Sequence, residues 1–130
     1  SIGIEALSRG AKAAVFVEFD KTASQFLKMN ITHVGAENDS QILFGDVKSY
    51  LASSPKTFDV VFCDPPYAID YLAQLPTIVF ESGVVNKNGI MIFEHPTRFE
   101  FSPSSLWKPI VERTYGRTSI TMFQHNTELL

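Results

Sequence analysis

The sequence predicts an α/β fold with a mostly parallel sheet, helices on both faces and an antiparallel hairpin at the C-terminal end. Two observations predict it. Short apolar segments rich in β-formers alternate with segments of helical periodicity, as in chains built from strand–helix–strand units. Near the end, apolar and polar residues alternate on both sides of Tyr115-Gly116-Arg117, which favours a hairpin.

The predicted elements follow one another with short connections. The predicted strands are residues 13–19, 41–44, 58–63 and 89–94, followed by hairpin strands at 110–114 and 119–124. The predicted helices are residues 2–9, ending at Gly10, then 22–31, 47–52 and 70–81, the last with Pro76 as its start or kink. Segment 58–63 has the clearest pattern of a buried strand, and the two prolines after it end its ladder.

Length and composition indicate one globular domain over residues 1–130. The net charge of −3 does not predict a nucleic-acid-binding surface. The single cysteine, Cys63, excludes an internal disulfide framework and favours a reducing compartment, so we expect a cytoplasmic protein. No apolar run approaches the length of a membrane span. The chain begins directly in a predicted helix, so we expect further residues upstream and an N-terminally incomplete domain.

Three acidic residues follow predicted strands, namely Glu18, Asp46 and Asp64. Open α/β sheets bind ligands beyond the carboxyl ends of their strands, so these residues are the candidate site. A carboxylate at Glu18 can accept hydrogen bonds from a ribose diol. Its offset from Gly3 fits a nucleotide-binding glycine motif if Gly3 is the third glycine and the first two lie upstream. Alternatively, Gly3 only permits close helix packing and Glu18 is a solvated strand end.

Asp46 allows two compatible interpretations. It could accept a hydrogen bond from an adenine amino group, or it could be the N-cap of the helix that begins at Val47, because aspartate is a favoured cap.

The motif Asp64-Pro65-Pro66-Tyr67 is the most specific signal in the chain. An exocyclic amino nitrogen of a base is a poor nucleophile because its lone pair is delocalised into the ring. The Asp64 carboxylate and the Pro65 carbonyl could accept its hydrogens and localise that lone pair. The prolines fix the turn and remove backbone donors, and Tyr67 offers a ring on which an extruded base can stack. The alternative is an ordinary turn that ends a strand.

The remaining candidates are weaker. Cys63 is interpreted as a small core residue. The histidines are His33, His95 and His125, and their spacing is not typical of a metal site. Glu94-His95-Pro96 ends a strand at the same sheet edge, so it is either part of a substrate pocket or a structural turn. Three arginines are either phosphate contacts or merely solvated side chains. They are Arg98, Arg113 and Arg117.

Five segments in order resemble the RsmD-like family of bacterial methyltransferases: S-I-G-I-E-A-L-S-R-G-A from Ser1, V-F-V-E-F-D, D-P-P-Y, I-M-I-F-E-H and Y-G-R-T-S-I-T-M-F. The resemblance covers nearly the whole chain. It implies a Rossmann-like methyltransferase sheet that uses S-adenosylmethionine to methylate a guanine N2 amino group of small-subunit (16S) ribosomal RNA. A C-terminal hairpin on such a sheet is typical of these enzymes.

By this resemblance, Gly3 ends the cofactor glycine motif, Glu18 holds the cofactor ribose and Asp46 lies near its adenine. Residues 64–67 form the target-amino site. The expected partner is ribosomal RNA or an assembly intermediate of the small subunit. We expect a monomeric protein that binds neither a membrane nor a metal. The family's first strand and its basic N-terminal segment would precede Ser1, which would account for the acidic balance here.

Three other functions fit parts of the pattern. An adenine-N6 DNA methyltransferase uses the same Asp-Pro-Pro-Tyr logic. A nicotinamide-dependent dehydrogenase has a similar fold, but neither this motif nor a terminal hairpin is expected there. A non-catalytic module that retains the fold would have no need of an intact motif at residues 64–67.

Overall fold

The structure is a computed structural model that describes residue 9 and residues 12–18, 20–53 and 56–127. It divides into two compact units, residues 1–53 and residues 54–130, each of which is described by itself. The predicted helix at residues 2–9, with Gly3, and the glycine stop at Gly10 lie outside the described residues, apart from Arg9 in a turn.

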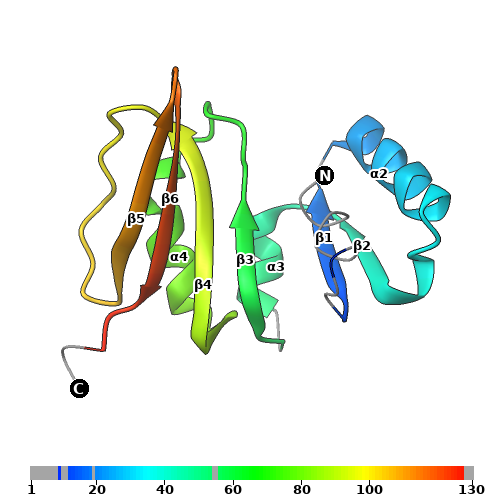
Figure 1. The fold of residues 1–130 in the computed structure, drawn as a ribbon, viewed down its shortest axis with the longest axis horizontal. Coiled ribbons are helices and arrows are strands. Elements are labelled where there is room, and N and C mark those ends of the chain that lie inside the picture. Colours follow the sequence, from blue (N-terminus) through cyan, green and yellow to red (C-terminus); the bar gives the residue numbers. More distant parts are fainter. Residues whose placement is uncertain (1–8, 10–11, 19, 54–55, 128–130) are drawn as a thin grey trace. The chain divides into compact units, whose positions relative to one another are not determined.

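The first unit is built on two parallel strands. Strand β1 (Ala14–Glu18) pairs in parallel with β2 (Ser40–Phe44), and the register places Glu18 opposite Phe44. Helix α2 (Lys21–His33) and the short 3-10 helix η1 (Glu37–Asp39) connect them, and α3 (Val47–Ser53) follows β2. Figure 1 shows α2 alongside the two strands, so this unit is a strand–helix–strand unit of the predicted kind.

Local sequence explains the bounds of α2. The Asp20 side chain accepts a hydrogen bond from the Thr22 backbone amide and caps the first turn. Ile31 is buried on the inner side of the helix, whereas Phe26 is exposed. The helix ends before Gly35, whose φ of 74° is a conformation that glycine adopts without steric cost.

The second unit contains a four-stranded mixed sheet in the order β3-β4-β6-β5. Strand β3 (Phe58–Cys63) and β4 (Val85–Pro96) are parallel, and they are connected through η2 (Leu72–Gln74) and α4 (Leu75–Glu81). Strands β5 (Trp107–Tyr115) and β6 (Thr118–His125) form the antiparallel hairpin, and β6 pairs with β4. The α/β class, the parallel pairs and the terminal hairpin are therefore confirmed.

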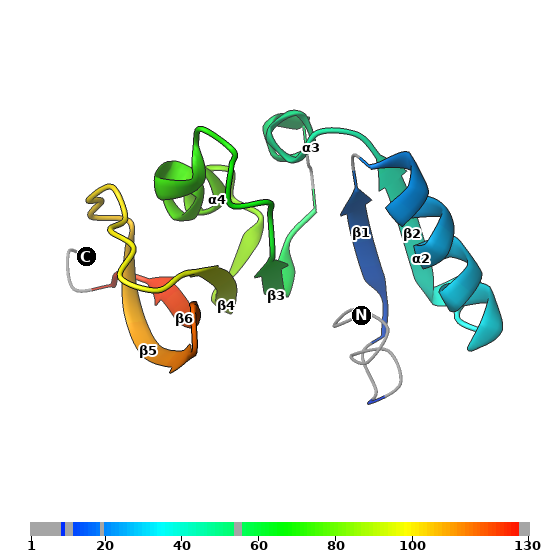
Figure 2. The same ribbon diagram turned by 90° about the horizontal axis from the view of Figure 1, so that it is seen from above.

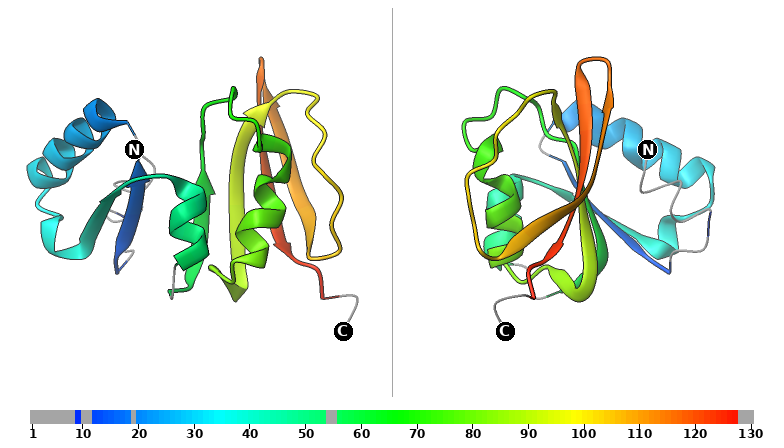
Figure 3. Two further views of the ribbon diagram at one scale, coloured as in Figure 1. Left: turned by 180° about the vertical axis from the view of Figure 1, so that it is seen from behind. Right: turned by 60° about the vertical axis from the view of Figure 1, so that its left-hand side comes forward.

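The core of the second unit lies between one face of its sheet and α4, as Figure 2 shows from above. Strand alternation directs Met91, Phe93 and His95 of β4 to this face, where they are buried. Their partners on β6 are also buried, including Phe123. The connection between β4 and β5 runs beside the hairpin (Figure 3) and is hydrogen-bonded to η2 from the Ser102 amide to the Ala73 carbonyl, at 3.0 Å.

Two differences from the predicted bounds have physical causes. Strand β4 is longer than predicted because it starts at Val85, opposite Phe58, and its residues 86–89 bulge opposite Asp59 before regular pairing resumes at Val60 and Ile90. At that bulge a Cβ on Gly89 would lie 2.9 Å from the Asp59 carbonyl oxygen, so the close approach requires glycine. The predicted helix at 70–81 begins instead as a 3-10 turn, and α4 proper starts with Pro76 in its first turn.

Candidate active site

Asp64 and Glu94 lie side by side at the carboxyl edge of the second unit's sheet. Cys63, the last residue of β3, pairs with Phe93 of β4 in parallel register. The next residue on each strand is therefore an acid. Glu94 points to the sheet face opposite the core, because Phe93 and His95 on either side of it point inward. Asp64 is exposed and Glu94 is half-buried.

The two carboxyl groups interact directly. A side-chain hydrogen bond with Asp64 raises the pKa of Glu94 above its usual value, and desolvation and the negative charge of Asp64 raise it further. A hydrogen bond between two carboxyl groups requires a proton on one of them. The pair can therefore share one proton, with Glu94 as the donor and Asp64 as the acceptor.

Tyr67 lies across the same edge. Its hydroxyl donates to Thr118 Oγ1 over 3.4 Å, which connects the motif to the start of β6. The side chain is still 43% exposed, so the ring is accessible for stacking. The turn is closed by a hydrogen bond of 3.4 Å from the Ile69 amide to the Pro66 carbonyl. Among the described residues, no hydrogen bond reaches the Pro65 carbonyl oxygen.

Cys63 and His95 belong to the fold. Burial raises the pKa of the Cys63 thiol to about 12, so the thiol stays protonated and is a poor nucleophile. His95 is 1% exposed, and its Nε2 is 2.7 Å from Thr121 Oγ1 while its Nδ1 is 2.9 Å from the Pro96 carbonyl. Its ring contacts Phe93, Phe99 and Phe101. Of the alternatives for Glu94-His95-Pro96, the structure therefore favours a structural role for His95.

The turn after β4 is hydrogen-bonded to the hairpin turn. The Thr97 amide donates to the Arg117 carbonyl at 3.1 Å, and its hydroxyl donates to the Gly116 carbonyl at 3.2 Å. Arg98 has a φ of 60°, and both it and Arg117 are exposed. Arg113 instead donates from Nη1 to the Glu112 carbonyl at 2.9 Å. Two of the three candidate arginines therefore lie on adjoining turns.

The first unit brings two other predicted residues to one edge. Glu18 and Phe44 end adjacent parallel strands, and Asp46 follows two residues after Phe44. Asp46 Oδ2 accepts from the Ser49 amide at 3.1 Å, so the predicted N-cap is confirmed. The adenine contact of Asp46 and the ribose contact of Glu18 stay predictions. Gly3, the third cofactor candidate, lies outside the described residues.

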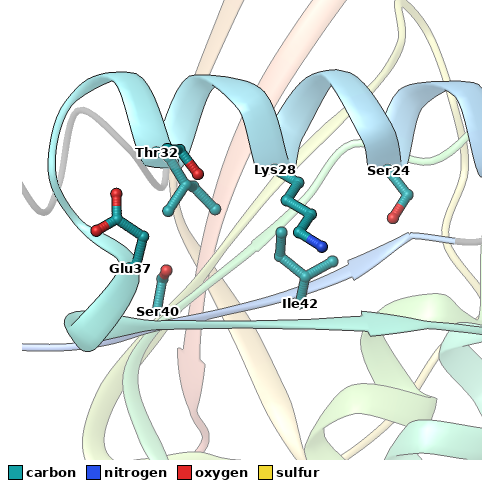
Figure 4. A pocket seen from close by; sticks show the side chains of 7 residues that line it. Ser24, Lys28, Thr32, Glu37, Ser40 and Ile42 are labelled. Atoms are coloured by element: carbon teal, nitrogen blue, oxygen red, sulfur yellow. The ribbon is translucent and has the colours of Figure 1, made fainter.

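A cleft of about 400 Å³ opens elsewhere in the first unit, between α2 and the beginning of β2. Figure 4 shows Lys28 and Thr32 on the helix facing Ser40 and Ile42 on the strand, with Glu37 at one end. Ser40 begins β2, so the cleft is at the opposite end of that strand from Asp46. It includes none of the predicted site residues.

For Glu94, the sequence pattern left a substrate pocket and a structural turn open as alternatives. The sequence showed that it ended a strand, but strand pairing register decides its neighbour. Among the described residues no cluster of three metal-ligating side chains occurs, and no helix is long and apolar enough to cross a membrane.

A family model described as "Conserved hypothetical protein 95" matches residues 1–124. This model represents the RsmD family, which is the family that the sequence resembles. The chain belongs to the RsmD family. The match extends from the first residues through the hairpin, so membership of the family rests on nearly the whole sequence and not on one motif.

Two curated relatives are similar to this RsmD family chain. YlbH of Bacillus subtilis, provisionally named an rRNA methyltransferase, is 30% identical over 128 residues, which is 95% of this chain and 69% of the relative. Ribosomal RNA small subunit methyltransferase D of Haemophilus influenzae is 28% identical over 96% of this chain and 66% of its own length. The chain thus spans about two thirds of these relatives.

Solved structures agree with the family. A crystal structure from Haemophilus influenzae, provisionally described as a methylase, has a TM-score of 0.83 and 28% identity, covering 95% of this chain and 79% of that one. A Podospora anserina methyltransferase bound to S-adenosylhomocysteine has a TM-score of 0.71 at 13% identity, covering 91% of this chain and 63% of that one, and it shows likeness of fold alone. The fold is that of Rossmann-like methyltransferases.

Proposed function

We propose that this chain is the catalytic part of an S-adenosylmethionine-dependent methyltransferase that methylates the N2 amino group of a guanine in small-subunit ribosomal RNA. The observation that carries the proposal is the arrangement of Asp64, Pro65 and Tyr67 at the carboxyl end of β3. Membership of the RsmD family and the names of the relatives support a ribosomal RNA substrate.

The geometry explains how the protein would activate a weak nucleophile. The Asp64 carboxylate and the Pro65 carbonyl are acceptors on consecutive residues, shortly before the exposed Tyr67. An extruded base that stacks on the ring would direct its amino hydrogens toward the acceptors. The negative charge of Asp64 would stabilise the positive charge that develops on the nitrogen as its bond to the methyl group forms and the methyl–sulfur bond of the cofactor breaks, and the methylated nitrogen would then lose a proton to solvent. The Pro65 carbonyl accepts the second hydrogen and fixes the orientation of the lone pair.

The cofactor is assigned to the carboxyl edge of the first unit. S-adenosylmethionine supplies an electrophilic methyl group on a sulfonium. Glu18 and Asp46, at the ends of adjacent parallel strands, are acidic acceptors that fit a ribose diol and an adenine amino group. Gly3 is proposed to allow the backbone to approach the cofactor closely. The cap made by Asp46 uses Oδ2, and a carboxylate has lone pairs enough for a further donor.

The biological setting follows from the substrate. The proposed partner is ribosomal RNA, either free or within an assembling small subunit. The proposed compartment is the cytoplasm, and the proposed oligomeric state is a monomer. The acidic balance of −3 over these 130 residues means that RNA affinity must come from local basic groups or from other parts of the protein.

A methyl-transfer assay tests the proposal. Full-length protein is mixed with labelled S-adenosylmethionine and, separately, with unmethylated small-subunit RNA, small subunits lacking the modification and duplex DNA. Digestion and mass spectrometry then identify the methylated nucleoside and its position. We expect N2-methylguanosine from RNA or subunits. N6-methyladenine from DNA would establish the alternative function, and absence of transfer to all three substrates would contradict the proposal.

A further inference from the structure

The Asp64–Glu94 pair places two acidic side chains side by side at the ends of β3 and β4. Every influence on the Glu94 carboxyl favours its protonated form, and the largest is the hydrogen bond to Asp64. In the described part of the chain no cationic side chain contacts either carboxyl group. On their sheet face, Arg113 lies one strand beyond Ile120, the β6 partner of Glu94, and Lys108 lies farther along β5, opposite Gln124 of β6. The Arg113 guanidinium donates to the Glu112 carbonyl.

A ligand can relieve this pair if it brings a cation or hydrogen-bond donors on adjacent atoms. Two ionised carboxylates repel each other unless donors or a cation lie between them. The pairing edge of guanine has an N1–H beside the N2 amino group, so it presents donors in a row. Adenine presents its N6 amino group beside N1, which is an acceptor. An ionised carboxylate next to adenine N1 would place two acceptors face to face.

We propose that Glu94 is a specificity-determining residue, which accepts the N1–H of the target guanine while Asp64 accepts a hydrogen of its N2 amino group. The juxtaposition at the ends of β3 and β4 carries the inference. It rests on the proposed function, because it requires that the site between Asp64 and Tyr67 receive a base. Guanine N–H donors then replace the shared proton between the two carboxyls.

Glu94 would discriminate between bases because its carboxylate has no partner on a base that lacks an N1–H. A site built to receive a donor rejects an analogue that lacks it, because a desolvated polar group is left without a partner. The useful analogue is 2-aminopurine, which keeps the 2-amino group but has an unprotonated N1. Glu94 should therefore separate guanine from 2-aminopurine, whereas Asp64 meets the same amino group in both bases.

The experiment compares guanine with 2-aminopurine at the position mapped in the first assay. Synthetic RNA carries either base and is presented in whichever form, free or reconstituted into subunits, accepted the methyl group. Single-turnover transfer gives kcat/KM for each base. We expect wild-type protein to prefer guanine by about 10- to 100-fold. Glu94→Gln, whose amide nitrogen can donate to N1, should lower that preference at least about tenfold, with a gain on 2-aminopurine.

Two further variants give the comparison its controls. Glu94→Ala removes the acceptor without adding a donor, so it should lose activity on guanine and gain none on 2-aminopurine. Glu112→Gln makes the same change at an exposed position on β5, and it should keep the wild-type preference. An unchanged base preference in folded Glu94→Gln and Glu94→Ala would overturn the role of Glu94 alone. Wild-type protein inactive on guanine would instead overturn the proposed function and this inference with it.

Discussion

At the scale of single residues, the central feature is a pair of acids held together by two neighbouring strands. The upward shift of the Glu94 pKa means that the folded protein binds a proton more tightly than the unfolded chain. The protein could relieve this repulsion by placing a neutral residue at either position. Perturbed carboxyl groups cluster at functional sites, and stability is commonly lost where an active site needs unfavourable charges.

The first prediction concerns catalysis by Asp64. Asp64→Asn preserves size but removes the charge that supports the developing positive nitrogen, so single-turnover methyl transfer should fall about 100- to 1000-fold. Cofactor affinity, measured separately by calorimetry, should change little because Asp64 is assigned to the base. Near-wild-type transfer by a folded Asp64→Asn protein would exclude this mechanism. Tyr67→Phe is the control, since it removes only the long hydroxyl contact to Thr118 and keeps the ring.

The second prediction concerns the stability cost of Glu94. Because its folded pKa is raised above the usual 4.5, its stabilising protonated contact is complete below 4.5 and is lost as the pH rises through the folded pKa. Glu94→Gln keeps a donor at every pH. The variant should therefore match wild-type protein in acid and become the more stable of the two above the folded pKa of Glu94.

Urea unfolding over a series of pH values measures this difference. The gap in unfolding free energy between Glu94→Gln and wild-type protein should open with rising pH and then level off. In an Asp64→Asn background the gap should shrink, because the hydrogen-bond partner and its charge are gone. A gap that does not depend on pH would show that the two carboxyls do not interact in solution.

At the scale of elements, the ends of strands and helices carry both fold and site. The proline pair ends β3 and also fixes the turn that positions Tyr67. Asp46 caps α3 and is also the proposed adenine acceptor. Residues that serve an element's end and a ligand together are expected wherever ligands bind at the carboxyl edge of a sheet. Substitutions at such positions must be chosen to separate the two roles.

The third prediction separates the roles of Asp46. Asp46→Ala should destabilise the protein by about 1 kcal/mol through loss of the cap, while Asp46→Ser should retain most of that stability. Serine is too short to replace the second carboxylate oxygen, so both variants should bind S-adenosylhomocysteine more weakly. Denaturant unfolding and calorimetry measure the two effects. Full cofactor affinity in Asp46→Ser would leave Asp46 with its capping role alone.

At the scale of the whole molecule, the question is whether the two units act together. Each has its own parallel strand pair, and the acidic residues assigned to the cofactor and to the base are divided between them. The sequence predicts a single domain, so we expect full-length protein to unfold in one cooperative transition. Cofactor that binds only the folded state should raise the midpoint of that transition.

The fourth prediction uses Glu18 to test this linkage. Glu18→Ala should weaken S-adenosylhomocysteine binding by about 1–3 kcal/mol, the scale of losing a charged hydrogen-bond partner. The rise in Tm on adding cofactor should shrink correspondingly, while Tm without cofactor stays close to that of wild-type protein. Calorimetry and thermal unfolding report the two quantities. Two separate transitions in wild-type protein would contradict the single domain, and unchanged affinity would remove Glu18 from the cofactor site.

The sequence by itself determined the α/β class, the strands at 58–63 and in the hairpin, and the position of the Asp-Pro-Pro-Tyr turn. These features depend on local pattern: hydrophobic periodicity, proline geometry and turn residues act over a few neighbouring positions. For the same reason the sequence predicted that Asp46 caps a helix, but it did not decide between that role and a contact with the cofactor.

Only the tertiary structure decided that Glu94 faces Asp64 while His95, its neighbour in sequence, is buried in the core. Consecutive residues of a strand point to opposite faces, and a shift of one residue in the pairing of β3 with β4 would have exchanged the two. That register depends on the bulge beside Gly89 and on the packing of α4, which join segments far apart in sequence. Long-range pairing of this kind leaves no local signal.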